Sequence, residues 1–203
     1  MSKQNSANNM KKDIILAGVG GQGILTIANV LGIAALDQGL YLKQAEVHGM
    51  SQRGGDVQSN LRISSEPIHS DLIAKGSADM IISMEPMEAL RYLPFLSPDG
   101  RIISNSVPFV NIDNYPAEEA VAAQFEKFGA RALLINADEI ARTCGSPRSA
   151  NIVLLGAASP YLEIDTEIIK QALIAHFAPK GDKIVDANLE AYRAGANCSL
   201  LAD

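Results

Sequence analysis

The chain has 203 residues, a length that fits one domain able to bury roughly 70% of its unfolded surface. Lys and Arg total 17 against 23 Asp and Glu, giving a formal net charge of −6, and this mildly acidic balance disfavours nucleic-acid binding. The two cysteines, Cys144 and Cys198, lie far apart, which argues against a disulfide framework, an iron–sulfur cluster and a cysteine-based zinc site. This cysteine usage fits a reducing compartment, and we expect a cytoplasmic protein.

Residues 1–12 are polar, with three Asn and three Lys, and predict a flexible N-terminal tail ahead of a single domain at residues 13–203. The apolar run 24–36 is 13 residues long, whereas a membrane span needs about 20. It therefore predicts a buried helix, and we expect no association with a membrane.

Short apolar or alternating runs predict strands, and periodic apolar patterns between them predict helices. Gly39 and Gly129 mark helix ends, Pro86 fits the first turn of a helix, and residues 97–100 (Ser-Pro-Asp-Gly) predict a turn ahead of a strand. In chain order the predicted elements are strand 13–17, helix 22–38, strand 41–47, loop 48–55, strand 57–63, strand 78–84, helix 85–93, strand 101–104, helix 116–128, strand 132–136, and helices 138–143, 149–158, 165–177 and 182–197.

Strands that alternate with helices are typical of a largely parallel sheet covered on both faces. We therefore predict an α/β fold with three layers: a mostly parallel, Rossmann-like sheet with helices on both faces. The C-terminal third, from Ser149 onward, is expected to be helical and part of the same domain.

Residues 18–23 read Gly-Val-Gly-Gly-Gln-Gly, between a short apolar strand and a long apolar helix. The spacing Gly18-x-Gly20-x-x-Gly23 is the dinucleotide-binding fingerprint in its required context. In that pattern Gly18 permits a tight turn, Gly20 lets the backbone approach a phosphate, and Gly23 lets the helix pack closely. The helix N-terminus attracts an anion. We therefore predict cofactor or phosphate contacts at Gly18, Gly20, Gly21, Gln22 and Gly23.

A second candidate loop, residues 48–55, reads His-Gly-Met-Ser-Gln-Arg-Gly-Gly. An imidazole, a hydroxyl, an amide and a guanidinium crowd this glycine-flanked segment, which is expected at the same sheet edge as the first glycines. The planar guanidinium of Arg53 favours bidentate contact with a phosphate or with a partner's carboxylate. The predicted binding residues of this loop are Met50, Ser51, Gln52, Arg53 and Gly54.

Other assignments stay open at this point. A nicotinamide cofactor would require an acidic residue about 20 residues after the glycines, and Glu46 stands 23 residues after Gly23. A stand-alone NAD(P)-dependent oxidoreductase and a non-catalytic binding or scaffold module therefore both remain possible functions.

Asn105 and Ser106 follow a predicted strand, where a ligand contact and a plain turn are equally open. The chain lacks Gly-x-Ser-x-Gly, His-Glu-x-x-His and a P-loop lysine, which argues against a hydrolase, a zinc peptidase and a P-loop protein.

Three segments are informative in combination. They are Gly18-Val-Gly-Gly-Gln-Gly-Ile24, Glu46-Val-His-Gly-Met-Ser-Gln-Arg-Gly-Gly55 and Ala78-Asp-Met-Ile-Ile-Ser-Met-Glu-Pro86. Together they resemble the gamma-type subunit or domain of the 2-oxoacid:ferredoxin oxidoreductase family, from residue 13 to about residue 195. The second segment looks most like the members that act on indolepyruvate, so the resemblance suggests an aryl pyruvate as the substrate.

In that family a 2-oxoacid is oxidatively decarboxylated to an acyl-CoA, with thiamine diphosphate forming the carbanion and 4Fe–4S clusters passing electrons to ferredoxin. This chain has no Gly-Asp-Gly…Asn-Asn thiamine motif, and its two cysteines cannot ligate a four-cysteine cluster. The resemblance therefore implies that both cofactors lie on a partner catalytic subunit and that this chain is inactive alone. It also makes CoA a candidate ligand or substrate of this subunit. We predict no metal site in the chain.

Overall fold

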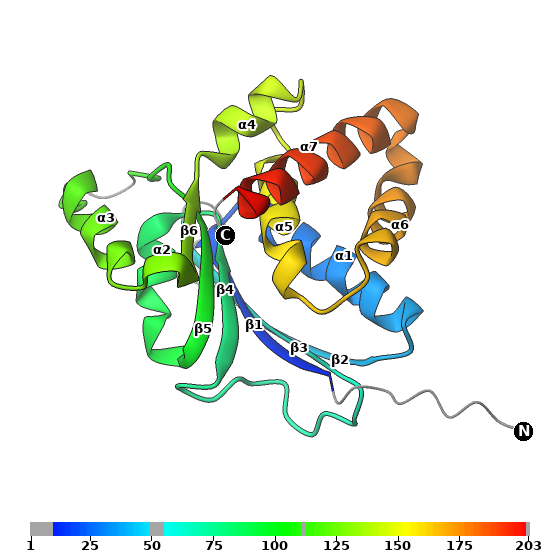
Figure 1. Cartoon of the computed structure of the whole chain (residues 1–203), viewed down its shortest axis with the longest axis horizontal. Coiled ribbons are helices and arrows are strands. Elements are labelled where there is room, and N and C mark those ends of the chain that lie inside the picture. The colour runs from blue at the N-terminus through cyan, green and yellow to red at the C-terminus, as the bar shows by residue number, and fades with distance from the viewer. Residues whose placement is uncertain (1–9, 49–54, 111–112, 202–203) are drawn as a thin grey trace, which may run out of the picture.

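The computed structural model describes residues 10–48, 55–110 and 113–201 and shows one six-stranded sheet between two layers of helices (Figure 1). The predicted α/β fold with a helical C-terminal part is confirmed. No helix among these residues is long and apolar enough to cross a membrane. The strands are β1 (Lys11–Val19), β2 (Tyr41–His48), β3 (Asp56–Ser64), β4 (Ala78–Ser83), β5 (Leu96–Asn105) and β6 (Ala132–Ile135). The α-helices are α1 (Ile24–Asp37), α2 (Pro86–Arg91), α3 (Glu118–Glu126), α4 (Ala137–Thr143), α5 (Ala150–Ala158), α6 (Thr166–Phe177) and α7 (Asp182–Leu200), and short 3-10 helices occupy Leu93–Phe95, Gly129–Arg131, Ser159–Tyr161 and Ala178–Lys180.

One strand of the sheet runs against the others. The order is β2-β3-β1-β4-β5-β6, in which β1, β4, β5 and β6 pair in parallel and β3 is antiparallel to both β1 and β2. The segment 49–55 between β2 and β3 is shorter than the crossover that a parallel pair needs, so an antiparallel return is the only arrangement open to it. As a result, the end of β2, the start of β3 and the end of β1 lie at one edge of the sheet.

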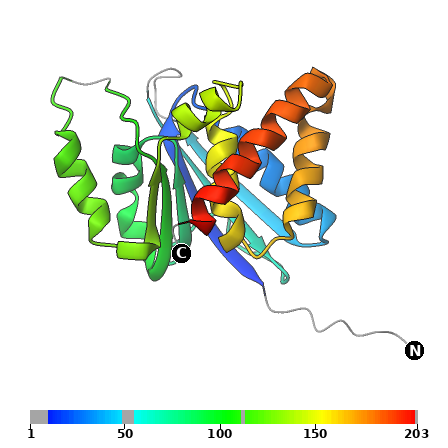
Figure 2. The same cartoon turned by 45° about the horizontal axis from the view of Figure 1, so that its top comes forward.

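Each face of the sheet packs against its own helices. α1, α5, α6 and α7 cover one face, and α2 and α3 cover the other (Figures 1 and 2). In β1, Ile14 and Leu16 belong to the first core, whereas Ile15 and Ala17 belong to the second, and all four are fully buried. Because successive side chains of a strand point to opposite faces, a continuous apolar run is what a strand covered on both sides requires.

The first strand begins earlier than predicted. Lys11 and Lys12, assigned above to the flexible tail, are part of β1, where Lys11 lies opposite Ser64 of β3. Met10 is buried in the core, and the Lys12 ammonium lies 2.7 Å from a carboxylate oxygen of Glu163. Pairing with a distant strand therefore recruits polar residues that carry no strand signal of their own.

The turn predicted at residues 97–100 is wrong, because β5 runs through that segment. The pairing register between β4 and β5 shifts between Ala78 and Met80. Such an irregularity lets a strand accommodate residues that disrupt a regular ladder, here a proline and a glycine. The turn signal thus coincides with the irregularity inside β5, between Leu96, which pairs with Ala78, and Arg101, which pairs with Met80.

α5 and α7 cross where two glycines face the backbone of the opposite helix. A methyl group on Gly156 would overlap the carbonyl oxygen of Tyr192, and one on Gly195 would overlap the carbonyl oxygen of Val153. The two helix backbones are therefore in direct contact, with no room for a side chain. Since every residue of α5 is buried, this contact fixes the position of α7 over the core.

Gly195→Ala should strongly destabilise the protein. Neither backbone can move aside unless a whole helix moves. We therefore expect the free energy of unfolding to fall by an amount near the upper end of the about 1–3 kcal/mol typical of overpacked sites. Gly32→Ala in α1 is the matched control, because a methyl group there meets only the side chain of Leu42, at 3.1 Å. Alanine also favours a helix over glycine by about 1 kcal/mol. Urea unfolding of wild type and both variants measures the change in the free energy of unfolding. A Gly195→Ala protein as stable as wild type would contradict the backbone contact.

Candidate functional site

β1 passes into α1 through a turn built on glycines. Gly18 lies inside β1, and a methyl group on it would come 2.6 Å from Cδ1 of Ile24 and 3.0 Å from Cβ of Met84. The turn itself lies at Gly21 and Gly23, whose φ angles of 101° and 82° are in the left-handed region that favours glycine. Gly18 serves this turn through packing, since a methyl group there would also come 2.9 Å from Oε1 of Gln22, while Gly21 and Gly23 supply the left-handed backbone.

Hydrogen bonds hold the turn in shape. The Val19 N–H donates to Oε1 of Gln22 at 2.8 Å, and the Gln22 N–H donates back to the Val19 carbonyl at 3.1 Å. The Gly20 N–H donates to the carbonyl oxygen of Gly55 at 2.9 Å. The Gln22 side chain thus shapes the turn, and the Gly20 N–H joins the turn to the start of β3.

α1 presents an uncapped N-terminus at this turn. It begins at Ile24 rather than at residue 22, because left-handed Gly23 occupies the N-cap position and no side chain caps the helix. The first N–H groups of a helix have no partner within the helix and carry partial positive charge. The Gly23 carbonyl accepts a hydrogen bond from Nδ2 of Asn151 at 2.9 Å, and a methyl group on Gly23 would lie 2.7 Å from that same atom. Gly23 therefore permits close packing, against α5.

Five predicted binding residues lie outside the described part of the chain: Met50, Ser51, Gln52, Arg53 and Gly54. Their contacts stay predictions. The residues on either side are described: His48 pairs in register with Val57, and Gly55 accepts the hydrogen bond from Gly20. Gly55 therefore brings one end of the second loop to the glycine turn, and His48 places the other end two strands away at the same edge of the sheet.

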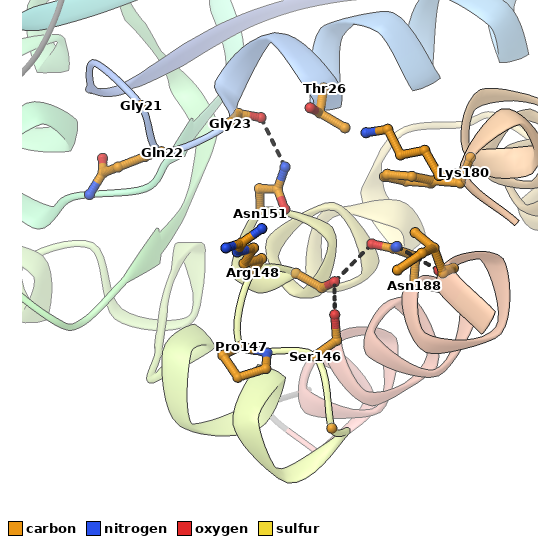
Figure 3. A pocket seen from close by; sticks show the side chains of 14 residues that line it. Gly21, Gln22, Gly23, Thr26, Ser146, Pro147, Arg148, Asn151, Lys180 and Asn188 are labelled. Atoms are coloured by element: carbon orange, nitrogen blue, oxygen red, sulfur yellow. Dashed lines mark hydrogen bonds between the residues drawn. The ribbon is translucent and has the colours of Figure 1, made fainter.

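A cavity of about 490 Å³ opens beside the glycine turn, on the face covered by α1, α5 and α7 (Figure 3). Its walls come from the turn at residues 21–23, Thr26 of α1, the connection between α4 and α5 at residues 145–149, Lys180, and Asn188 of α7. Segments far apart in sequence therefore converge on one site, and Asn151 and Gly23, which join two of them, are separated by 128 positions.

A chain of polar side chains fixes the connection between α4 and α5 against α7. The hydroxyl oxygens of Ser146 and Ser149 lie 2.6 Å apart, and Ser149 donates to Oδ1 of Asn188 at 2.9 Å. The Asn188 amide donates in turn to the carbonyl of Ile184 at 2.7 Å. The sequence analysis missed this connection; its Gly-Ser-Pro-Arg run signals a loop, but no local signal places that loop beside the first glycines.

The opposite flank of the turn carries acidic side chains with structural partners. The hydroxyl of Tyr92 donates to both carboxylate oxygens of Asp56, the first residue of β3, at 3.0 and 2.8 Å. Burial and this carboxylate raise the pKa of Tyr92. Burial also raises the pKa of Glu88, which neighbouring Asp56 raises further and the ion pair with Arg91 opposes. This network anchors the start of β3 to α2.

Asn105 and Ser106, left open above, have structural roles. Asn105 is 2% exposed; its Nδ2 donates to a carboxylate oxygen of Asp138 at 2.7 Å, and its Oδ1 accepts from the N–H of Ala137 at 3.0 Å. The Ser106 N–H donates to the carbonyl of Ile135 at 2.8 Å. These bonds join the end of β5 to β6 and to the start of α4.

Within the described ranges, no group of three His, Cys, Asp or Glu side chains is placed to hold a metal ion. Cys144 and Cys198 are both free thiols. Burial raises the pKa of each, which keeps both thiols protonated at neutral pH. The chemistry offered by the site is therefore that of backbone amides, hydroxyls, amides and cations.

Residues 13–198 match the family described as pyruvate ferredoxin/flavodoxin oxidoreductase. The chain belongs to this family. The indolepyruvate oxidoreductase subunit IorB of Thermococcus kodakarensis is 36% identical to it over 196 residues, which cover 92% of this chain and 95% of that protein. The 2-oxoglutarate synthase subunit KorC of Methanothermobacter marburgensis is 29% identical over 187 residues, covering 92% of this chain and 95% of that protein. The resemblance stated from the sequence is confirmed.

Solved structures of the pyruvate ferredoxin/flavodoxin oxidoreductase type share the fold. The gamma subunit of a keto/oxoacid ferredoxin oxidoreductase from Geobacter sulfurreducens PCA superposes with a TM-score of 0.69 at 22% identity, covering 94% of this chain and 99% of that one. The 2-oxoglutarate:ferredoxin oxidoreductase from Magnetococcus marinus, with 2-oxoglutarate, coenzyme A and succinyl-CoA bound, gives 0.75 at 21% identity, covering 96% of this chain and 32% of that one. Both structures thus share the fold of almost the whole chain.

The buried carboxyl of Glu88 should make the stability of this family member depend on pH. Its pKa in the folded state is raised above the ordinary 4.5, so the native state retains a proton that the unfolded chain releases. The resulting stabilisation is present below about pH 4.5 and is lost as pH rises through the raised pKa. Glu88→Gln removes the titration, so the unfolding free energy of wild type relative to this variant should fall as pH rises above about 4.5.

Urea unfolding at several pH values measures this difference. Glu126→Gln, on an exposed position of α3, is the matched carboxylate-to-amide change and reports the effect of charge removal alone. A difference between wild type and Glu88→Gln that rises with pH would contradict the assignment.

Proposed function

We propose that this chain is a subunit of a 2-oxoacid:ferredoxin oxidoreductase that acts on indolepyruvate or a related aryl pyruvate, and that it binds CoA beside its glycine turn. The observation that carries the proposal is the match to IorB subunits along almost the whole chain. The geometry adds an uncapped helix N-terminus and a glycine turn at the sheet edge to which both ends of the second loop return.

In the proposed reaction the bond between C1 and C2 of the 2-oxoacid breaks and CO₂ leaves. The acyl carbon loses two electrons, which reduce two ferredoxins by one electron each. The CoA sulfur forms the thioester bond and its proton is released. The balance requires an electron carrier, and the two cysteines of this chain cannot supply the four thiolates of a cluster.

We therefore assign the iron–sulfur clusters and thiamine diphosphate to a partner catalytic subunit. Those groups would supply the redox and carbanion chemistry, and ferredoxin would meet the complex through that partner. Both cysteines of this chain are free thiols, which fits a reducing cytoplasm, where we place the complex.

CoA fits what this chain offers. CoA carries a pyrophosphate and a 3′-phosphate, and a glycine turn leading into a helix N-terminus is a general anion site. At Gly21 nothing lies within 4 Å of the place where a Cβ would stand, so the backbone is approachable there. Gln22 and Gly23 line the cavity beside this point. Arg53, in the second loop, is proposed to pair with a CoA phosphate or with a carboxylate of the partner subunit.

The position of Glu46 speaks against a stand-alone nicotinamide enzyme. Glu46 lies on β2, and β3 separates β2 from β1, a displacement of about 10 Å for two strand spacings. In the dinucleotide-binding arrangement the strand after the first helix lies directly beside the first strand. The Glu46 carboxylate also accepts a hydrogen bond from the Gln44 amide at 2.7 Å. The acidic residue is therefore not where a ribose bound at the glycine turn would meet it.

The isolated chain should be colourless and without activity, whereas the complex with its thiamine-bearing partner should form acyl-CoA from indolepyruvate. Anaerobic purification of the chain alone and of the co-expressed pair, followed by visible absorbance and acyl-CoA product analysis, tests this. A brown cluster absorbance or 2-oxoacid oxidation by the chain alone would overturn the division of labour. Stabilisation by NAD(H) would favour the nicotinamide alternative, and a tight complex that turns over no 2-oxoacid would favour a scaffold.

A further inference from the structure

The cavity beside the glycine turn has a charge opposite to that of the chain. The chain carries a net charge of −6, yet the residues that line the cavity include two cations, Arg148 and Lys180, and no Asp or Glu. Neither cation forms an ion pair with any residue in the described ranges, whereas nearby Arg142 is paired with Glu139. Two uncompensated cations facing one cavity in an acidic protein indicate an anionic ligand.

The two cations belong to opposite walls of the cavity. Lys180 extends toward Thr26 in the first turn of α1, and Arg148 stands beside Asn151 in the first turn of α5 (Figure 3). The Lys180 ammonium lies 5.0 Å from the centre of the Phe177 ring, which holds its side chain against the wall. A ligand between the starts of the two helices would therefore be met by positive charge from both sides.

Uncharged hydrogen-bond donors also line the cavity. Neither α1 nor α5 has a side-chain cap at its N-terminus. The N–H groups of the first two residues of each helix therefore remain open to a ligand, whereas those of Thr26 and Ile152 already donate to the carbonyls of Gly23 and Ser149. The hydroxyls of Thr26 and Ser146 line the same space, and Ser149 is held rigid by its bond to Asn188. The site thus offers two full charges and several donors around one cavity.

We infer that this cavity is a binding site for a phosphomonoester. A terminal phosphate carries a charge of about −1.5 to −2 and three strong acceptor oxygens, which matches two separated cations and multiple donors. A carboxylate, with one charge and two oxygens, would leave one of the two cations without an ion-pair partner. Two sources present this group: the 3′-phosphate of CoA, an occupant that rests on the proposed function, and a free nucleotide such as 3′-AMP.

Equilibrium binding separates these sources. Calorimetric titrations of the full-length chain, alone and in complex with its partner subunit, would use CoA, dephospho-CoA, 3′-AMP and adenosine as probes. Arg148→Gln and Lys180→Gln should each weaken binding of CoA and 3′-AMP by about 10-fold or more, and leave dephospho-CoA binding unchanged. Arg142→Gln is the matched control, since it removes a nearby charge that is paired on α4. All three side chains are exposed, so thermal melting should show that each variant is folded.

Each outcome decides one of the two claims. Equal affinities of the wild type for CoA and dephospho-CoA would overturn the phosphomonoester site and leave the proposed function standing. Binding of 3′-AMP that depends on Arg148 and Lys180, without binding of CoA, would support the site and overturn the proposed role in CoA binding. Absence of binding by both CoA and 3′-AMP, or variants that bind them as wild type does, would overturn the site.

Discussion

The antiparallel insertion of β3 beside β1 is the constraint on which the functional part of this molecule depends. β3 pairs with β1 from Lys11 and Ser64 at one end to Val19 and Asp56 at the other. The buried carboxylate of Asp13 and the guanidinium of Arg62, 2.7 Å apart, reinforce the pairing. Because β3 runs backward, it begins where β1 ends.

Two consequences follow from this direction. Gly55, the residue directly before β3, lies at the glycine turn, and the hydrogen bond from Gly20 to Gly55 closes that junction. β2 is pushed outward by one strand, so its acidic residue, Glu46, is displaced from the position that a dinucleotide site requires. A single reversed strand therefore changes a familiar fingerprint into a different kind of site.

The turn separates two flanks of opposite chemistry. On the α2 side, Asp56 and Glu88 are carboxylic side chains engaged by Tyr92 and Arg91. On the α5 side the lining residues include cations and no carboxylates. An anion bound in the cavity would therefore lie beside positive side chains, and the partial charge at the start of α1 acts in the same direction.

The elements predicted correctly from the sequence are those that a local pattern of residue types encodes. The apolar run of β1 and the glycines after it gave the strand, the turn and the helix, since burial on both faces and left-handed φ angles each leave a signature in residue type. Distant pairing left no such signature. Lys11 and Lys12 became strand residues only because β3 pairs with them, and the turn signal at residues 97–100 lies inside β5, at the irregularity in its pairing with β4.

The sequence predicted only one part of the candidate site, the glycine turn. Its glycine half is continuous in sequence, whereas Arg148, Asn151 and Lys180 come from segments whose place depends on how α5 and α7 pack. That packing rests on two glycines, Gly156 and Gly195, which carry no pattern of their own in a helix. A loop of Gly, Ser, Pro and Arg has many uses, and only the tertiary arrangement makes this one a wall of the cavity.

The composition of the cavity also limits which reactant this subunit can select. Relatives named for indolepyruvate, ketoisovalerate and 2-oxoglutarate all align with about nine-tenths of this chain. Those acids differ in size, charge and polarity, so a fold common to their enzymes suits a reactant that the reactions share. The lining consists mainly of glycines, hydroxyls, amides and two cations, with few large apolar side chains such as Phe177 and Ile184, so it suits an anionic group better than the apolar part of a 2-oxoacid. Under the proposed assignment, discrimination among 2-oxoacids therefore falls to the partner subunit.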